Sequence, residues 1–233
     1  MNRLSPLAEA LLTSAVVTGA VTVASATLPD KYVATAVAMV FVGAAWAMVW
    51  RHDDARVRAA GLAFGGLVIP GALDLRGAFR AAVPALGWAL LFAVITFVPF
   101  FVGWRWWWHA GGTFHFAGGA KGTLDAVFGQ LVLIALPEES FYRGYLQSRL
   151  DTVWPPRLRV LGAALGPGIL VTSVIFALGH FATIREPARL AVFFPALLFG
   201  WLRARTGGVG AGVVFHALCN LFSEALGRGY GIY

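Results

Sequence analysis

The sequence has few charged residues and a single cysteine. Only 12% of its 233 residues are Asp, Glu, Lys or Arg, whereas a soluble domain usually contains about 25%. So few charges cannot cover the surface of a water-soluble globule, and 59% of the residues are apolar. The composition therefore indicates a protein that has lipid as its solvent. The lone Cys219 excludes an internal disulfide and a zinc site built from cysteines.

Most of the charges that are present are positive. Eighteen Lys and Arg residues against eleven Asp and Glu give a net charge of +7. The basic residues lie mainly in short segments between apolar runs, which is the distribution that the positive-inside rule produces. They therefore indicate membrane topology, and we expect no nucleic-acid partner.

The apolar runs predict an all-α fold, a polytopic transmembrane helical bundle of about seven spans. About 20 apolar residues are needed to cross the hydrocarbon core as a helix. The first run resembles a signal peptide, but it is longer than a usual signal and a second run follows almost at once, so we expect an uncleaved span. The predicted spans are residues 6–28, 32–50, 81–103, 124–147, 168–184, 190–202 and 209–226.

Residues 59–72 are also apolar, but this segment has only 14 residues, including four Gly and one Pro. We interpret it as an interfacial or hairpin element; if it crosses, the bundle has eight spans. With seven spans and a cytoplasmic N-terminus, eleven basic residues lie inside and six outside, whereas eight spans give nine against eight. The positive-inside rule therefore favours seven spans and a cytoplasmic N-terminus.

We expect two regions. Residues 1–120 form an N-terminal membrane region of about three spans plus interfacial segments, and residues 121–233 form a core of about four spans. Four tryptophans within 104–108 fit an aromatic belt at the membrane interface. The glycine-rich stretch that follows contains His109 and His115, and we interpret it as a surface loop, not a metal site.

The first segment with intramembrane charges contains Glu138, Glu139 and Arg143. Glu139 and Arg143 are four residues apart, so on a helix their side chains meet and neutralise each other. Adjacent helical residues point about 100° apart, which leaves Glu138 without a cation on its own helix. A helix-locking ion pair would explain Glu139 and Arg143 but not Glu138. We therefore expect Glu138 to face a cavity, where it is suited to act as a general base on water.

Two further spans carry polar residues one helical turn apart. His180 follows Phe176 by four residues, and Asn220 follows His216 by four. A single histidine in a span is more often a packing residue, but an asparagine is able to orient an imidazole or to stabilise an oxyanion. The rise of about 1.5 Å per residue places both histidines and Glu138 near one level of the bilayer. Such a group is able to bind a metal or to activate water.

These three motifs, EExxxR at 138–143, FxxxH at 176–180 and HxxxN at 216–220, resemble those of the CPBP or ABI family of CAAX proteases and bacteriocin-processing enzymes. The surrounding residues are also similar to the myxosortase branch, which trims C-terminal sorting signals. The resemblance covers roughly residues 120–226 and implies an all-helical intramembrane peptidase with a water-filled cavity.

The resemblance also implies roles for the motif residues. Glu138 and His180 would activate the water that attacks the scissile carbonyl, and His216 and Asn220 would stabilise the oxyanion. The supporting residues would be Glu139, Arg143 and Phe176.

Metal dependence stays open at this point. The family has been described both as metalloproteases and as metal-free glutamic proteases, and the sequence has no HExxH motif. Glu138, His180 and His216 suit either chemistry, as ligands of a divalent metal such as zinc or as proton-transfer groups. We favour a reaction that requires no cofactor.

The predicted function is that of an intramembrane endopeptidase acting on a membrane-embedded or lipidated protein substrate. A CAAX-like tail, a leader and a C-terminal sorting signal are candidate substrates. We expect the protein to lie in the bacterial inner (cell) membrane, with the lipid bilayer as its other partner.

Three alternatives compete with this prediction. A non-catalytic immunity or scaffold protein would retain the same polar core. A secondary transporter would show two related halves with broken helices, and these halves are unlike. A thiol protease using Cys219 would need an activating partner, but His216 lies on the same helix and no activating environment is evident.

Overall fold

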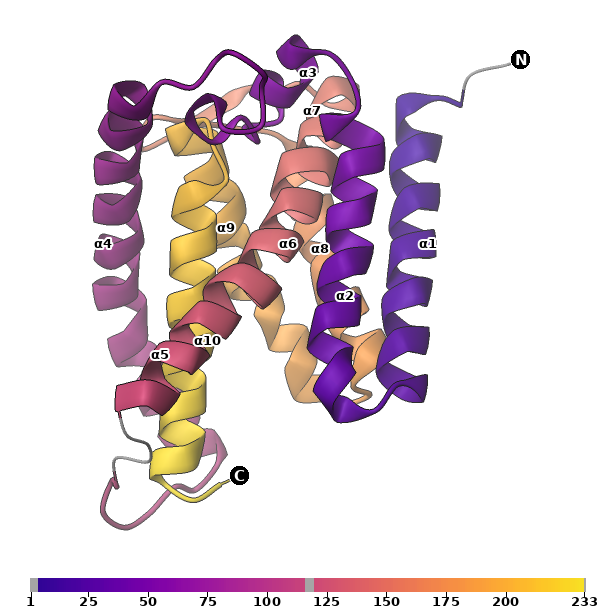
Figure 1. Cartoon of the computed structure of the whole chain (residues 1–233). Coiled ribbons are helices and arrows are strands. Elements are labelled where there is room, and N and C mark those ends of the chain that lie inside the picture. Colours follow the sequence, from indigo (N-terminus) through magenta and orange to yellow (C-terminus); the bar gives the residue numbers. More distant parts are fainter. Residues whose placement is uncertain (1–3, 116–119, 233) are drawn as a thin grey trace.

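The computed structural model describes residues 4–115 and 120–232, and it consists almost entirely of helices packed as a bundle (Figure 1). The predicted all-α membrane bundle is confirmed, since every predicted apolar run forms a helix. These helices are α1 (Pro6–Thr27), α2 (Asp30–Ala45) with the π-helical turn η1 (Trp46–Trp50), α4 (Leu75–Trp107), a composite helix over residues 120–153, α8 (Pro167–Thr183), α9 (Phe193–Thr206) and α10 (Gly210–Gly229).

Local sequence sets several helix ends. The Ser5 side chain accepts a hydrogen bond from the Ala8 N–H before α1, and Asp74 does the same for Gly77 before α4. Both follow the usual preference for short polar side chains at a helix N-cap. Helix α9 ends at Gly207, which has a positive φ of 76° that costs glycine little.

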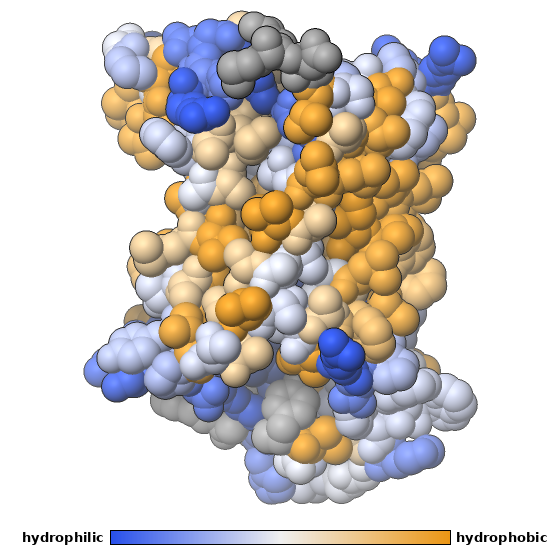
Figure 2. Space-filling view, turned by 90° about the vertical axis from the view of Figure 1, so that its right-hand side faces the viewer, coloured by the Kyte–Doolittle hydropathy of each residue, from blue (hydrophilic) through white to orange (hydrophobic). Residues whose placement is uncertain are grey.

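Among the described residues, three helices are long and apolar enough to cross a membrane by length and composition: α1, the joined α2–η1 and α4. Helix α8 is apolar but has 17 residues. Figure 2 shows a broad apolar band between two polar ends of the molecule, as expected for a surface that faces lipid. Large apolar side chains, such as those of Val16, Met39 and Val94, are exposed on this surface.

The segment 59–72 forms no long helix, as predicted. It follows the short helix α3 (Asp54–Ala59) and contains one 3-10 turn, η2 (Phe64–Gly66). Gly61 has a φ of 68°, and a Cβ there would lie 2.7 Å from the Gly207 carbonyl oxygen. The segment is therefore a coil packed against the connection between α9 and α10.

A small β-hairpin was not predicted. Strand β1 (Leu158–Val160) pairs antiparallel with β2 (Ala163–Leu165). The Val160 carbonyl accepts a hydrogen bond from the Trp201 indole of α9 at 3.0 Å. This tertiary contact and the backbone pairing explain the strands, because three-residue segments have no sequence periodicity that would reveal them.

The composite helix positions the site. It runs through α5 (Ala120–Phe128), η3 (Gly129–Ala135), α6 (Leu136–Glu139), η4 (Ser140–Gln147) and α7 (Ser148–Val153), where η3 and η4 are π-helical. Figure 1 shows it running obliquely across the bundle, passing in front of α10. Its middle packs against α2, α8, α9 and α10. Side chains of α6 and η4 therefore reach the interior from a central position.

Candidate active site

The first motif lies where α6 meets η4. Glu139 and Arg143 are fully buried, and Glu138 is 8% exposed. The flanking π-helical turns are wound more widely than an α-helix, a feature that is frequent at functional sites. Burying three ionisable groups is costly unless each is paired or serves a reaction.

The predicted ion pair between Glu139 and Arg143 is formed and is part of a larger network. Arg143 donates from Nη1 to Glu139 Oε1 at 3.1 Å and from Nη2 to the Ala196 carbonyl at 3.0 Å. The same Glu139 oxygen lies 3.0 Å from His216 Nδ1. One carboxylate therefore joins the composite helix to α10, and Arg143 joins it to α9.

Hydrogen bonds define the protonation of both histidines. His180 Nδ1 lies 3.0 Å from the Phe176 carbonyl oxygen, which only accepts, so Nδ1 carries the hydrogen. His216 Nδ1 likewise donates to the Glu139 carboxylate. In each neutral ring the free lone pair is therefore on Nε2.

Both free Nε2 atoms face Glu138. His180 Nε2 and His216 Nε2 each lie 4.0 Å from Glu138 Oε2. This is longer than a direct hydrogen bond of about 2.7–3.2 Å, but a water bonded to both atoms at about 2.8 Å would span roughly 4–5 Å. Within the described residues, Glu138 Oε2 is buried and has no hydrogen-bond partner. The structure thus brings three of the predicted site residues together around one unsatisfied carboxylate oxygen.

A cavity of about 120 Å³ opens beside this group. It exceeds the roughly 10–15 Å³ that one water needs. Glu138 and His180 line it from the composite helix and α8, and Thr18 of α1 and Phe41 of α2 also line it. Residues of the N-terminal region therefore contribute to the site. Its other lining residues are Val21, Ser25, Val37, Tyr142, Gly179, Thr183, Ile184 and Arg189.

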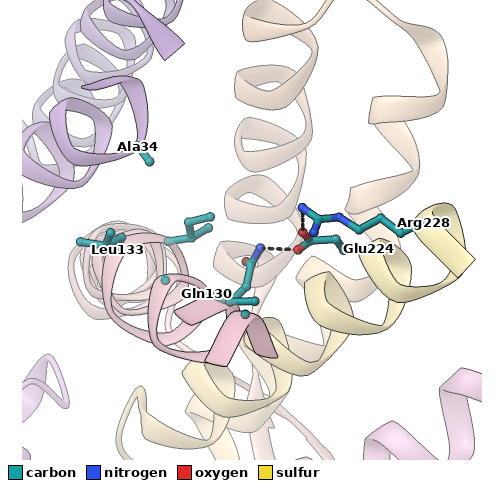
Figure 3. Close-up of a pocket in the computed structure, with 9 residues that line it drawn as sticks. Ala34, Gln130, Leu133, Glu224 and Arg228 are labelled. Carbon is teal, nitrogen blue, oxygen red and sulfur yellow. Dashed lines mark hydrogen bonds and ion pairs between the residues drawn. The ribbon is translucent and has the colours of Figure 1, made fainter. Parts of the chain in front are cut away.

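Asn220 is held by a residue that sequence reasoning missed. Its Nδ2 donates to Gln130 Oε1 at 2.9 Å, and Gln130 Nε2 donates to Glu224 Oε2 at 3.4 Å. Glu224 in turn pairs with Arg228 at 2.6 Å. Figure 3 shows Gln130, Glu224 and Arg228 along one side of a larger pocket of about 310 Å³, with Ala34 on α2 across from them. The signal was available, since Gln130 is an amide in the apolar first half of a predicted span, two turns before Glu138.

The larger pocket contains neither Glu138 nor either histidine. We therefore take the smaller cavity as the candidate reaction site, because two reacting groups line it. The Asn220 amide has two N–H groups, so its bond to Gln130 leaves one free for another acceptor.

Aromatic rings fix the charged groups. The predicted supporting residue Phe176 lies 4.5 Å from the Arg143 guanidinium carbon and 4.4 Å from the His180 ring, measured to ring centroids. Phe199 of α9, which was not predicted, stacks on His216 at 4.8 Å with an interplanar angle of 13°. A glycine also matters: a Cβ at Gly212 would lie 3.0 Å from Glu139 Oε2. Neither residue belongs to a motif, so only packing identifies them.

The metal alternative can be compared with this geometry. Two nitrogen or oxygen ligands at about 2.0–2.1 Å from a tetrahedral zinc lie about 3.4 Å apart, whereas Glu138 Oε2 is 4.0 Å from each Nε2. The described part of the chain contains no group of three or more His, Cys, Asp or Glu side chains arranged to hold a metal. As placed, Glu138, His180 and His216 do not fit a tetrahedral site. His115 hydrogen-bonds to Thr113 at 2.9 Å, within the predicted surface loop, of which residues 116–119 lie outside the described residues.

Residues 120–222 match the family model of type II CAAX prenyl endopeptidases, Rce1-like. The match spans all three motifs and confirms the resemblance to CAAX proteases. No curated protein and no solved structure matches the chain.

Proposed function

Because residues 120–222 belong to the Rce1-like family of CAAX proteases, we propose that this chain is an intramembrane endopeptidase that uses Glu138 and His180 to activate water. The observation that carries the proposal is the convergence of two imidazole Nε2 atoms on one buried, unsatisfied oxygen of Glu138. The adjoining cavity gives substrate access to this group. A helix-locking role would account for Glu139 and Arg143 but would leave Glu138 without a function.

In the proposed reaction, a water lies within hydrogen-bonding reach of Glu138 and His180. Glu138 accepts its proton as the water oxygen attacks the scissile carbonyl carbon. The tetrahedral intermediate then collapses, the carbon–nitrogen bond breaks, and the proton passes to the leaving amine from Glu138 or through His180. Because two groups share the proton, activity would depend on the pH behaviour of the coupled Glu–His pair.

His216 and Asn220 are proposed to stabilise the oxyanion. His216 donates its Nδ1 hydrogen to Glu139, so a hydrogen bond from Nε2 to the oxyanion requires a second hydrogen on the ring. Asn220 supplies its second amide N–H. Glu139 and Arg143 orient His216 and are positioning residues.

The proposed substrate is a membrane-associated protein, either membrane-embedded or lipidated. Two observations support this class. The family description names prenyl-modified CAAX substrates, and the cavity is walled on one side by the apolar helices α1 and α2, so a substrate anchored in the bilayer is already concentrated beside it. Leaders and sorting signals remain candidate substrates within this class. We further propose the bacterial cell membrane as the location, with a cytoplasmic N-terminus.

The test uses purified protein in lipid vesicles and an internally quenched, S-farnesylated CAAX peptide. Glu138→Gln should reduce kcat/KM by about 10²–10⁴-fold, the usual contribution of a general base. The substitution preserves size, and Glu138 Oε2 has no hydrogen-bond partner within the described residues, so thermal unfolding should change little. Glu186→Gln, in an exposed loop, is the matched control and should cleave normally.

Normal cleavage by Glu138→Gln would refute the assignment of the base. Absence of cleavage by the wild type, with prenylated, leader and sorting-signal peptides alike, would favour a non-catalytic immunity or scaffold protein.

A further inference from the structure

One basic residue lies on the wall of the candidate reaction cavity. Arg189 belongs to the 3-10 turn η5 (Pro187–Val192), which follows α8. It lines the same cavity as Glu138 and His180. No other Lys or Arg of the described residues lines that cavity. Among these residues, Arg189 therefore supplies the only permanent positive charge on the cavity wall.

The Arg189 side chain has no partner within the described residues. The Arg189 backbone N–H donates to the Glu186 carbonyl at 2.9 Å. The guanidinium forms no ion pair or hydrogen bond with any described residue. Arg189 is exposed at the rim of the cavity, whereas the buried Arg143 is paired with Glu139. A guanidinium presents five donors in a planar fork that matches a carboxylate. This cation is therefore available to an anion that enters the cavity.

We propose that Arg189 binds the free C-terminal carboxylate of the substrate and thereby determines specificity. The inference rests on the proposed function, because it assigns the cleavage site to the Glu138–His180 end of the same cavity. The carboxylate of Glu138 repels a second carboxylate, so the charged terminus lies at Arg189 while the neutral scissile amide lies at the catalytic pair.

The size of the cavity limits what lies between these two points. At about 120 Å³ it is smaller than the roughly 300–1,000 Å³ pockets that hold drug-sized ligands. It therefore accommodates only a short piece of chain beyond the scissile bond. Arg189 would thereby place the scissile bond close to the C-terminus of the substrate.

The experiment compares two S-farnesylated CAAX peptides that differ only at the C-terminus, one a free carboxylate and the other an amide. Wild-type protein in vesicles should prefer the carboxylate by about 10- to 100-fold in kcat/KM, the range expected of a charge-assisted hydrogen bond. Arg189→Gln should lower cleavage of the carboxylate peptide to that of the amide and leave amide cleavage unchanged. Arg189→Lys should retain part of the preference. The matched control is Arg185→Gln, because Arg185 is exposed nearby but does not line the cavity.

Four results would overturn the inference. The first is equal cleavage of the carboxylate and amide peptides by the wild type. The second is an Arg189→Gln variant that still prefers the carboxylate peptide. Either result leaves the proposed function intact. If Arg189→Gln slows both peptides equally, and only in vesicles that contain phosphatidylglycerol, the arginine binds a lipid headgroup instead. If wild type and Glu138→Gln both fail to cleave either peptide, the proposed function fails, and this inference fails with it.

Discussion

Two Glu–Arg pairs with the same four-residue spacing should differ greatly in their contribution to stability. In the pair of Glu139 and Arg143 the side chains are 0% and 1% exposed, and in the pair of Glu224 and Arg228 they are 27% and 59% exposed. Replacing Arg143 with Met leaves the buried Glu139 charge without its guanidinium, which should cost about 3–5 kcal/mol of unfolding free energy. Arg228→Met breaks a solvent-accessible pair and should cost about 0–1 kcal/mol.

Methionine preserves most of the volume of the arginine stem, so the loss reports mainly on charge. Combining Arg143→Met with Glu139→Gln removes both charges, while the glutamine oxygen still accepts from His216. The double variant should therefore be more stable than Arg143→Met alone, and the difference measures the coupling.

The assay is equilibrium unfolding in mixed micelles with an increasing fraction of SDS, followed by the fluorescence of the nine tryptophans. Equal losses for Arg143→Met and Arg228→Met would refute the reasoning. So would a double variant that is no more stable than Arg143→Met.

Three further predictions concern pH, topology and metal. Burial raises the pKa of the Asp151 carboxyl from 3.8 to about 6, against an opposing effect of Arg203. The stabilising contribution of Asp151 is therefore complete below about pH 4 and is lost as the pH rises through 6. Tm should be higher at pH 5 than at pH 7, and this difference in Tm should be smaller in Asp151→Asn. In a Cys219→Ser background, single cysteines at 51–58 and 151–159 should be labelled from the cytoplasm and those at 110–115 from outside; the reverse pattern for 151–159 would show the orientation to be wrong. Activity should survive a strong chelator, whereas one equivalent of metal that is lost together with activity and restored by added zinc would establish a metalloenzyme.

The sequence by itself determined the features that depend on neighbours along one helix. Apolar runs of about 20 residues predicted the helices, because backbone hydrogen bonds must be satisfied internally in lipid. Spacing of four residues predicted the Glu139–Arg143 contact, and the leftover acid Glu138 indicated a cavity. The three motifs were sufficient to recognise the family.

Only the tertiary structure decided which helices meet, and at what level. The shared hydrogen bond of Glu139 with His216, the stacking of Phe199 on that ring and the partner of Asn220 join residues 17 to 90 positions apart. The cavity wall formed by α1 and α2 and the position of Arg189 beside the catalytic pair arise in the same way. Such contacts depend on the tilt, depth and rotation of each helix, which follow from side-chain packing between helices and not from the periodicity of any one of them.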